Sequence, residues 1–272
     1  MKFSFNINNN NYHFSSNKFY DLSIPLNFNK EQPNIYGVEK ATSHPFKDDN
    51  FVGDTRLGGS CNFESIKLVP HCNGTHTECI GHITKKRISI HQQLKDVLMP
   101  NTLISVTPIK MPKTDETYNP KLEPNDLLIS KSILMEAMKN VDQNFIEALT
   151  IRTFPNSKTK QSRNYIEIEP PFFSIEALEY IVELGVVHLL VDIPSIDRTF
   201  DEGQLNAHHI FWNIHNGSHD VNKDSEMNKT ITEMIYVPNY ITDGKYLLNL
   251  QIPPFVSDAS PSRPVIFEII EE

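Results

Sequence analysis

The segment 174–193 restricts the fold more than any other part of the sequence, because it joins a helical pattern directly to a strand pattern. Ser174 is a suitable N-cap residue, and Gly185 marks the end of the helix. Between them the apolar residues recur at helical spacing, namely Ile175, Leu178, Ile181 and Val182. Residues 186–193 then read as one continuous apolar strand. A helix that leads into a buried strand is typical of α/β proteins, so we predict that fold class.

The rest of the chain alternates between short strand patterns, helix patterns and polar loops. Further helices are expected at 131–139, capped by Ser130, and at 204–212. The patterns predict strands at 20–26, 62–69, 103–109, 148–152, 230–237, 245–252 and 265–270. Loops are expected at 27–57, 111–125, 154–170 and 213–229.

Two segments near the N-terminus bear on the organisation of the chain. Residues 62–69 alternate between apolar and polar, which predicts a half-buried strand that leads straight to His71. Residues 1–19 are rich in asparagine and predict an N-terminal extension or an edge strand. No internal repeat or linker divides the remainder, so residues 20–272 are expected to form a single domain.

Composition excludes several classes of protein. With 39% hydrophobic and 22% charged residues the chain is an ordinary globular protein, and no apolar run approaches the ~20 residues of a membrane span. The net charge of −9 argues against a nucleic-acid partner, because phosphate is bound mainly through clustered Lys and Arg. The first residues lack the layout of a secretory signal, and three cysteines do not make a disulfide framework. We therefore expect a cytoplasmic protein.

Residues 71–82 concentrate the side chains that bind metals, in the order His-Cys-Asn-Gly-Thr-His-Thr-Glu-Cys-Ile-Gly-His. Imidazoles and carboxylates are the ligands that a catalytic divalent metal takes. His76 and Glu78 are two residues apart and would share one face of a strand. Gly74 would allow a backbone bend that lets His71 and His76 converge. The alternative is a polar loop whose histidines have no common role.

The C-terminal third adds further candidates. His208 and His209 follow Ala207, and Glu233 lies within the apolar strand pattern at 231–235. A buried acid must be paired, because desolvation of an unpaired charge is costly, and a metal would satisfy it. The alternative is that Glu233 occupies a solvent-facing position on a half-buried strand.

These residues lead to a resemblance that covers most of the chain. Residues 71–82 resemble the His-x-Gly-Thr-His-x-Asp-x-Pro-x-His signature of the metal-dependent cyclase/hydrolase family that includes bacterial kynurenine formamidase. Further segments are similar to that family in the same order, at 20–26, 148–153, 191–197, 205–208, 243–246 and 258–264. The resemblance implies a central mixed β-structure of the swivelling β/β/α type flanked by helices, a catalytic domain over 20–272, and a homodimer.

The resemblance also implies roles for individual residues. It assigns metal ligation to His76, Glu78, His208 and Glu233, with His209 as the alternative to His208, and proton transfer to His82. His82 could instead only orient Glu78. Asp197 and Arg263 are interpreted as structural residues that close turns.

The sequence departs from the family signature in three ways. Glu78 replaces the aspartate, and Cys79, Ile80 and Gly81 replace the proline-containing stretch. One extra residue before Gly74 leaves either His71 or Cys72 as the first ligand. A β-bulge could absorb the insertion and favour His71, whereas a Cys72 thiolate would shift the site towards zinc.

The function that follows is metal-dependent hydrolysis of a C–N bond in a small-molecule amide, formamide or cyclic amide. Zinc is the expected ion and manganese the alternative. A cyclase or dehydratase that uses the same metal, and a non-catalytic metal- or ligand-binding protein, are the competing hypotheses. The sequence contains no dinucleotide-binding or P-loop glycine motif and no Gly-x-Ser-x-Gly elbow.

Overall fold

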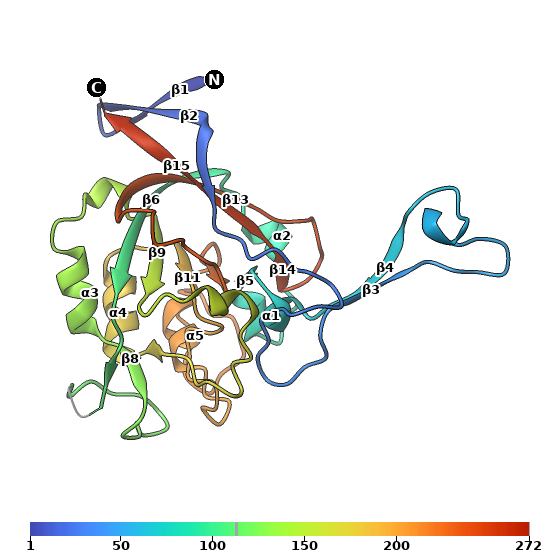
Figure 1. Cartoon of the computed structure of the whole chain (residues 1–272). Helices are drawn as coiled ribbons and strands as arrows, with labels where there is room; N and C mark the ends of the chain where they lie inside the picture. The colour runs from blue at the N-terminus through green and yellow to red at the C-terminus, as the bar shows by residue number, and fades with distance from the viewer. Residues whose placement is uncertain (112–113, 272) are drawn as a thin grey trace.

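One large mixed β-sheet organises the fold (Figure 1). The computed structural model describes residues 1–111 and 114–271. Over these residues the sheet has ten strands, in the spatial order β1 (Lys2–Ile7), β2 (Asn10–Asp21), β15 (Arg263–Glu271), β13 (Gly244–Gln251), β6 (Leu98–Val106), β9 (Ala148–Thr153), β11 (His188–Val191), β12 (Thr230–Glu233), β5 (His76–Cys79) and β14 (Ala259–Pro261). The strands from β6 to β12 are parallel and the outer ones antiparallel. The predicted α/β class is confirmed.

Helices cover one face of the parallel strands, as Figure 1 shows. The main ones are α3 (Lys131–Met138), α4 (Ile175–Glu183) and α5 (Asn206–Phe211). Ser130 and Ser174 cap α3 and α4 as expected, because each hydroxyl accepts a hydrogen bond from a backbone N–H three residues on. The core between the helices and the sheet includes Leu134, Leu178, Phe211, Leu149 and Leu189.

The opposite face of the sheet carries a second core, which includes Leu103, Leu190, Leu248 and Ile266. The remaining helical turns are short, namely α1 (Pro70–Asn73), α2 (Ile90–Gln93), η1 (Thr55–Leu57), η2 (Ile80–His82), η3 (Gln143–Phe145) and η4 (Lys158–Ser162). A three-stranded sheet combines β7 (Ile109–Lys110), β8 (Leu127–Ile129) and β10 (Phe172–Phe173). None of the described helices is long and apolar enough to cross a bilayer.

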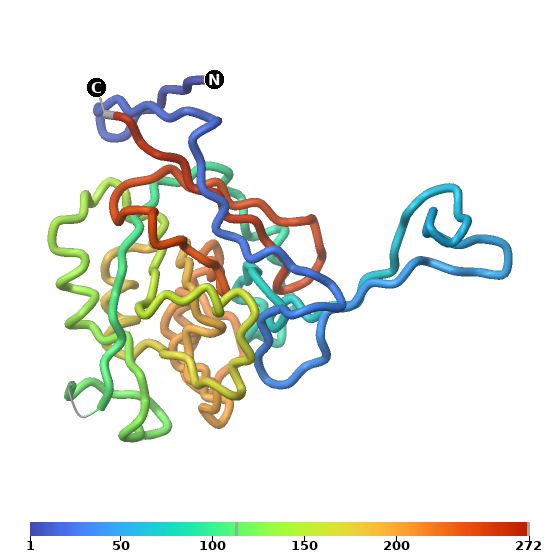
Figure 2. Tube along the Cα trace, in the orientation of Figure 1, coloured from blue at the N-terminus to red at the C-terminus, as the bar shows by residue number. Residues whose placement is uncertain are grey.

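The prediction of a half-buried strand at 62–69 is wrong. The strand there, β4 (Glu64–Lys67), is exposed along its whole length and pairs only with β3 (Thr42–Pro45), which lies inside the expected loop 27–57. The two strands form an arm that projects from the body of the molecule (Figure 2). The alternation is present, but neither face of this ribbon has a core to pack against.

Three other strand boundaries differ from the prediction. Of the strand expected at 20–26, only Tyr20 and Asp21 lie in a strand. They are the end of β2, which forms a hairpin with β1 and extends the sheet. The strand expected at 103–109 already begins at Leu98 and is interrupted after Val106. The strand expected at 230–237 ends at Glu233, because Met234 has a positive φ of 53° that breaks the extended backbone.

Candidate metal centre

Two paired strands supply three of the candidate ligands. In β5, His76 and Glu78 share one face because successive side chains of a strand alternate. The antiparallel register places Glu233, the last residue of β12, opposite His76. All three are buried, with exposed fractions of 0%, 1% and 3%. The solvent-facing alternative for Glu233 is therefore wrong.

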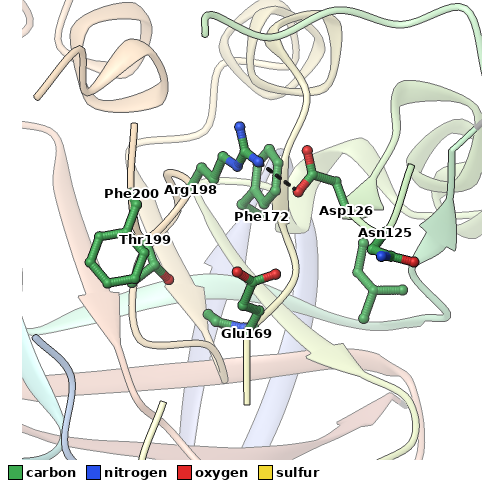
Figure 3. A pocket seen from close by; sticks show the side chains of 9 residues that line it. Asn125, Asp126, Glu169, Phe172, Arg198, Thr199 and Phe200 are labelled. Atoms are coloured by element: carbon green, nitrogen blue, oxygen red, sulfur yellow. Dashed lines mark ion pairs between the residues drawn. The ribbon is translucent and has the colours of Figure 1, made fainter. Parts of the chain in front are cut away.

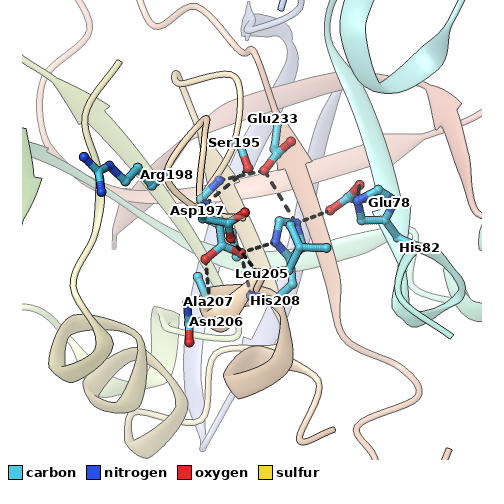
Figure 4. Close-up of polar contacts among 12 residues, drawn as sticks. Glu78, His82, Ser195, Asp197, Arg198, Leu205, Asn206, Ala207, His208 and Glu233 are labelled. Atoms are coloured by element: carbon cyan, nitrogen blue, oxygen red, sulfur yellow. Dashed lines mark hydrogen bonds and ion pairs between the residues drawn. The ribbon is translucent and has the colours of Figure 1, made fainter. Parts of the chain in front are cut away.

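The other candidates come from three short helical elements around these strands. His71 lies on α1, His82 ends η2, and His208 lies on α5. Glu78 contacts two of these histidines. Its Oε2 lies 2.8 Å from Nδ1 of His71. Its Oε1 lies 2.9 Å from Nε2 of His208, a contact drawn in Figure 4. Nε2 of His82 is 3.9 Å from Oε2 of the same carboxylate. His76 approaches Glu233 instead, with Nε2 3.5 Å from Oε2.

The carboxylates make this cluster a strong site for positive charge. Burial raises the pKa of Glu78, but His82, His208 and His71 outweigh burial and hold that pKa well below its usual range. Burial lowers the pKa of His71, yet hydrogen bonds to Asp258 and Glu78 raise it to about 10. The pKa of His208 is likewise raised, because Asp197 and Glu78 outweigh the effect of burial. The buried acids thus favour a nearby cation.

The donor atoms also fit a divalent metal. Nε2 of His76 is buried and has no hydrogen-bond partner. Single ligand atoms of His71, His76 and Glu78 lie within 4.8 Å of one another, and so do those of Glu78, His82 and His208. Unpaired buried polar atoms are costly, and a shared cation would satisfy them.

Two histidines are already oriented for this purpose. Nδ1 of His76 is 3.0 Å from the carbonyl oxygen of Gly74, and Nδ1 of His208 is 2.5 Å from Oδ2 of Asp197. With Nδ1 directed at these oxygens, Nε2 of each ring points into the cluster, the arrangement typical of metal-ligating histidine. Gly74 contributes its carbonyl rather than a bend, because its φ of 163° is ordinary extended backbone.

His71 and Cys72 point into different surroundings. The Cys72 thiol is buried in an apolar cluster with Ile24, Ile35 and Tyr165, and burial raises its pKa to about 11. Over the described chain, no group of converging ligand atoms includes Cys72, whereas His71 belongs to two. His209 is also separate, because its Nδ1 lies against the carbonyl oxygen of Ile214.

Asp258 is a residue of the cluster that the sequence analysis missed. Its Oδ2 lies 2.8 Å from Nε2 of His71 and 3.6 Å from Nδ1 of His82. The only sequence signal was its place at the start of the segment 258–264, which resembles the family but has no metal-binding spacing. Asp258 directly precedes β14. Because β14 pairs with β5, this pairing brings Asp258 to the site.

Asp197 does more than close a turn. Its carboxylate accepts hydrogen bonds from the backbone N–H groups of Ala207 and His208 and from the Tyr118 hydroxyl, as well as contacting Nδ1 of His208. Arg263, by contrast, pairs with Asp21 at 2.7 Å, which joins β15 to β2.

Access to the cluster comes from one side. The side chains of His71, His82 and Asp258 are 21–28% exposed, whereas the other cluster residues are nearly inaccessible. The pocket next to Arg198 in Figure 3 is a different feature: its cavity is about 60 Å³, Arg198 pairs with Asp126 at 3.1 Å, and none of the histidines lines it.

Comparison with known proteins identifies the family. A family model described as Putative cyclase matches residues 20–198, more than half of the chain. The chain belongs to this cyclase family. Among curated proteins, none is detectably similar in sequence to this cyclase family member.

Solved structures share the fold of this cyclase family member at low sequence identity. Isatin hydrolase A from Labrenzia aggregata, bound to benzyl benzoate, has a TM-score of 0.61 and 12% identity over 94% of each chain. A predicted metal-dependent hydrolase from Bacillus stearothermophilus has a TM-score of 0.57 and 15% identity, covering 92% of this chain and 98% of that one. An isatin hydrolase bound to the product analogue thioisatinate has a TM-score of 0.58 and 14% identity, covering 93% and 92%.

Proposed function

We propose that this protein is a metal-dependent hydrolase that cleaves the C–N bond of an amide, a formamide or a cyclic amide. The convergence of His71, His76, Glu78, His208 and Glu233 carries the proposal, because it combines closely spaced imidazole and carboxylate ligand atoms with excess negative charge. Fold relatives described as metal-dependent hydrolases and isatin hydrolases support the reaction class.

These five side chains are the ligands we assign, with His71 rather than Cys72 completing the set. A set of imidazoles and carboxylates suits zinc, with manganese as the alternative. A divalent ion held there supplies Lewis-acid chemistry, by activating water and polarising a carbonyl group. The protein itself holds the imidazole rings of the ligands in place. It also excludes water from the buried side of the site, away from His82.

His82 is the residue we assign to proton transfer. Its side chain is 28% exposed, so a substrate can reach it, and its ring stacks on His71 with centroids 4.2 Å apart. Asp258 approaches both imidazoles, and its Oδ2 lies 3.6 Å from Nδ1 of His82. Nε2 can then take a proton from attacking water and return it to the leaving nitrogen. In the alternative, His82 only orients Glu78.

The experiment compares metal content and amide hydrolysis in Glu78→Ala and His82→Ala. Glu78→Ala should lose both, because the acid contacts His71 and His208 at once. His82→Ala should keep its metal but lose about 10²–10⁴-fold in rate. Glu179→Ala, an exposed acid on α4, is the matched control. Unchanged turnover in Glu78→Ala would overturn the proposal, and full activity in His82→Ala would leave His82 with an orienting role.

A cyclase reaction at the same metal is the second candidate, because the family is described by that activity and one fold relative is a potential hydrolase with cyclase activity. Mass spectrometry of products formed in ¹⁸O-labelled water separates the two. Hydrolysis adds labelled oxygen to the product, whereas ring closure by elimination adds none.

A further inference from the structure

A second cluster of ligand atoms lies away from the metal centre. It consists of Asp96, Glu147 and His188, whose ligand atoms are within 4.8 Å of one another. These residues lie just before β6, just before β9 and at the start of β11, three parallel strands that are neighbours in the sheet (Figure 1). Parallel strands begin at the same edge, so the cluster sits at their amino ends.

His188 is the buried member of this cluster. Its exposed fraction is 0%, and its Nδ1 is 2.8 Å from the Thr230 hydroxyl. Its Nε2 is buried without a hydrogen-bond partner and lies 3.4 Å from Oδ2 of Asp96. Burial lowers the pKa of His188, although Asp96 opposes the effect. Nε2 therefore faces the Asp96 carboxylate across a gap too long for a good hydrogen bond, and a cation between the two atoms would satisfy both.

Glu147 is fixed beside His188 by its backbone. Its carbonyl oxygen accepts hydrogen bonds from the N–H groups of Val187 and His188, at 2.9 and 3.0 Å. Burial and the charge of Asp96 raise the pKa of the Glu147 carboxyl. Glu147 forms no ion pair with any Lys or Arg of the described residues. The cluster therefore holds two adjacent acids and an acceptor nitrogen without a positive partner.

We propose that Asp96, Glu147 and His188 bind a second divalent cation of the zinc class. Zinc takes imidazole and carboxylate ligands at about 2.0–2.2 Å, so two ligands of a tetrahedral ion are about 3.4 Å apart. The separation of His188 Nε2 and Asp96 Oδ2 already has this value. Asp96 is 49% exposed, which leaves the outer coordination positions open to water. The ion would tie the segment before β6 to β9 and β11. This inference does not depend on the proposed hydrolase function.

The test counts zinc in the full chain. Chelator-stripped protein is reloaded with Zn²⁺, dialysed and analysed by plasma mass spectrometry. Asp96→Asn and Glu147→Gln should each retain one ion per chain fewer than the wild type, whereas Glu179→Gln, an exposed acid on α4, should match the wild type. Asp96 is half exposed, so its substitution leaves the core intact.

Cobalt gives a second measurement that locates the ion. Titration of the stripped protein with Co²⁺ should show a visible absorption component that is absent from Glu147→Gln and retained in Glu78→Ala. Equal zinc content in the wild type and both cluster variants would overturn the proposal. Equal zinc content would not bear on the hydrolase proposal. That proposal would instead fail if Glu78→Ala kept the metal content and the turnover of the wild type.

Discussion

The imidazole of His208 is held through both of its ring nitrogens. Nδ1 lies 2.5 Å from Asp197, and Nε2 lies 2.9 Å from Glu78. Asp197 is itself held by the Tyr118 hydroxyl and by the backbone at the start of α5. A carboxylate behind a ligating histidine fixes the tautomer and the direction of the free nitrogen. The strength of the metal centre thus depends on a residue that we do not expect to touch the metal.

Asp197→Asn should weaken zinc binding by about 10–100-fold, because an amide can neither accept as strongly nor hold the His208 proton on Nδ1. The dissociation constant measured by competition with a chromophoric chelator checks this. Tyr118→Phe is the control, since it removes one hydrogen bond of 2.6 Å but keeps the carboxylate. Equal affinity in Asp197→Asn and wild type would show that Asp197 only anchors α5.

Spacing in the sequence predicted the local part of the site but not its distant contacts. His76 and Glu78 could be placed on one strand face from their two-residue separation alone. The choice between His71 and Cys72 could not be made, because it depends on α1, where successive side chains point about 100° apart. Asp258 lies 187 residues from its partner His71, and only the pairing of β14 with β5 brings the two together.

The turn η2, which carries His82, packs closely against the backbone of Ile88. Gly81 lies in this turn, and a Cβ atom there would be 2.1 Å from the carbonyl oxygen of Ile88 and 3.2 Å from Cβ of Asp258. Gly81 is therefore required by packing. It lets the turn bring His82 beside the metal centre.

Gly81→Ala should destabilise the protein by about 1–3 kcal/mol, because the backbone must shift to admit one methyl group. It should also lower turnover through displacement of His82. Gly74→Ala is the matched control, since its Cβ would meet nothing closer than 3.9 Å. Urea unfolding and kcat of both variants test this, and equal stability of the two would contradict the packing argument.

The pairing of β2 with β15 includes a hydrogen bond from the Tyr20 hydroxyl to the Glu268 carboxylate. This bond, with smaller effects of burial and charge, raises the pKa of Tyr20 to about 12. The native chain thus keeps the Tyr20 proton between about pH 10 and pH 12, where an unfolded tyrosine loses it. The stabilisation is complete below pH 10 and declines as the pH rises towards 12.

Tyr20→Phe should therefore reduce the urea midpoint at pH 8, and its difference from the wild type should shrink as the pH approaches 12. Tyr240→Phe, a neighbouring exposed ring, should follow the wild-type pH profile at every point. A constant difference between Tyr20→Phe and wild type from pH 8 to 12 would show that the hydrogen bond does not set the pH dependence.

At the scale of the whole molecule, the two proposed metal sites lie at opposite ends of β12. Glu233, in the metal centre, is its last residue, and Thr230, the partner of His188, is its first. The α/β class could be predicted from the helix and strand at 174–193, because each pattern there is local. The arm could not be predicted, because alternation along 62–69 does not reveal whether the rest of the chain covers it.

The projecting arm bears on assembly. Exposed apolar side chains gather along it, including Phe46, Leu57, Phe63 and Ile66, with exposed fractions from 40% to 58%. Exposed apolar side chains gathered on one segment are typical of a protein interface. We propose a homodimer in which these arms contact the partner subunit. Light scattering after gel filtration should then give a molar mass of about 62 kDa, twice that of the 31.2 kDa chain. Two copies are expected because most homo-oligomers are closed dimers with two-fold symmetry.

Shortening the arm should convert this dimer to a monomer. Ser43 and Ile66 are paired across β3 and β4, so residues 44–65 can be replaced by Asn-Gly as a two-residue hairpin loop. The body of the fold keeps its own cores, so circular dichroism and metal content should stay as in the wild type. The milder variant Ile66→Asp should raise the dimer dissociation constant without removing the arm. A shortened chain that still scatters as a dimer, or a wild type that scatters as a monomer, would refute the role of the arm.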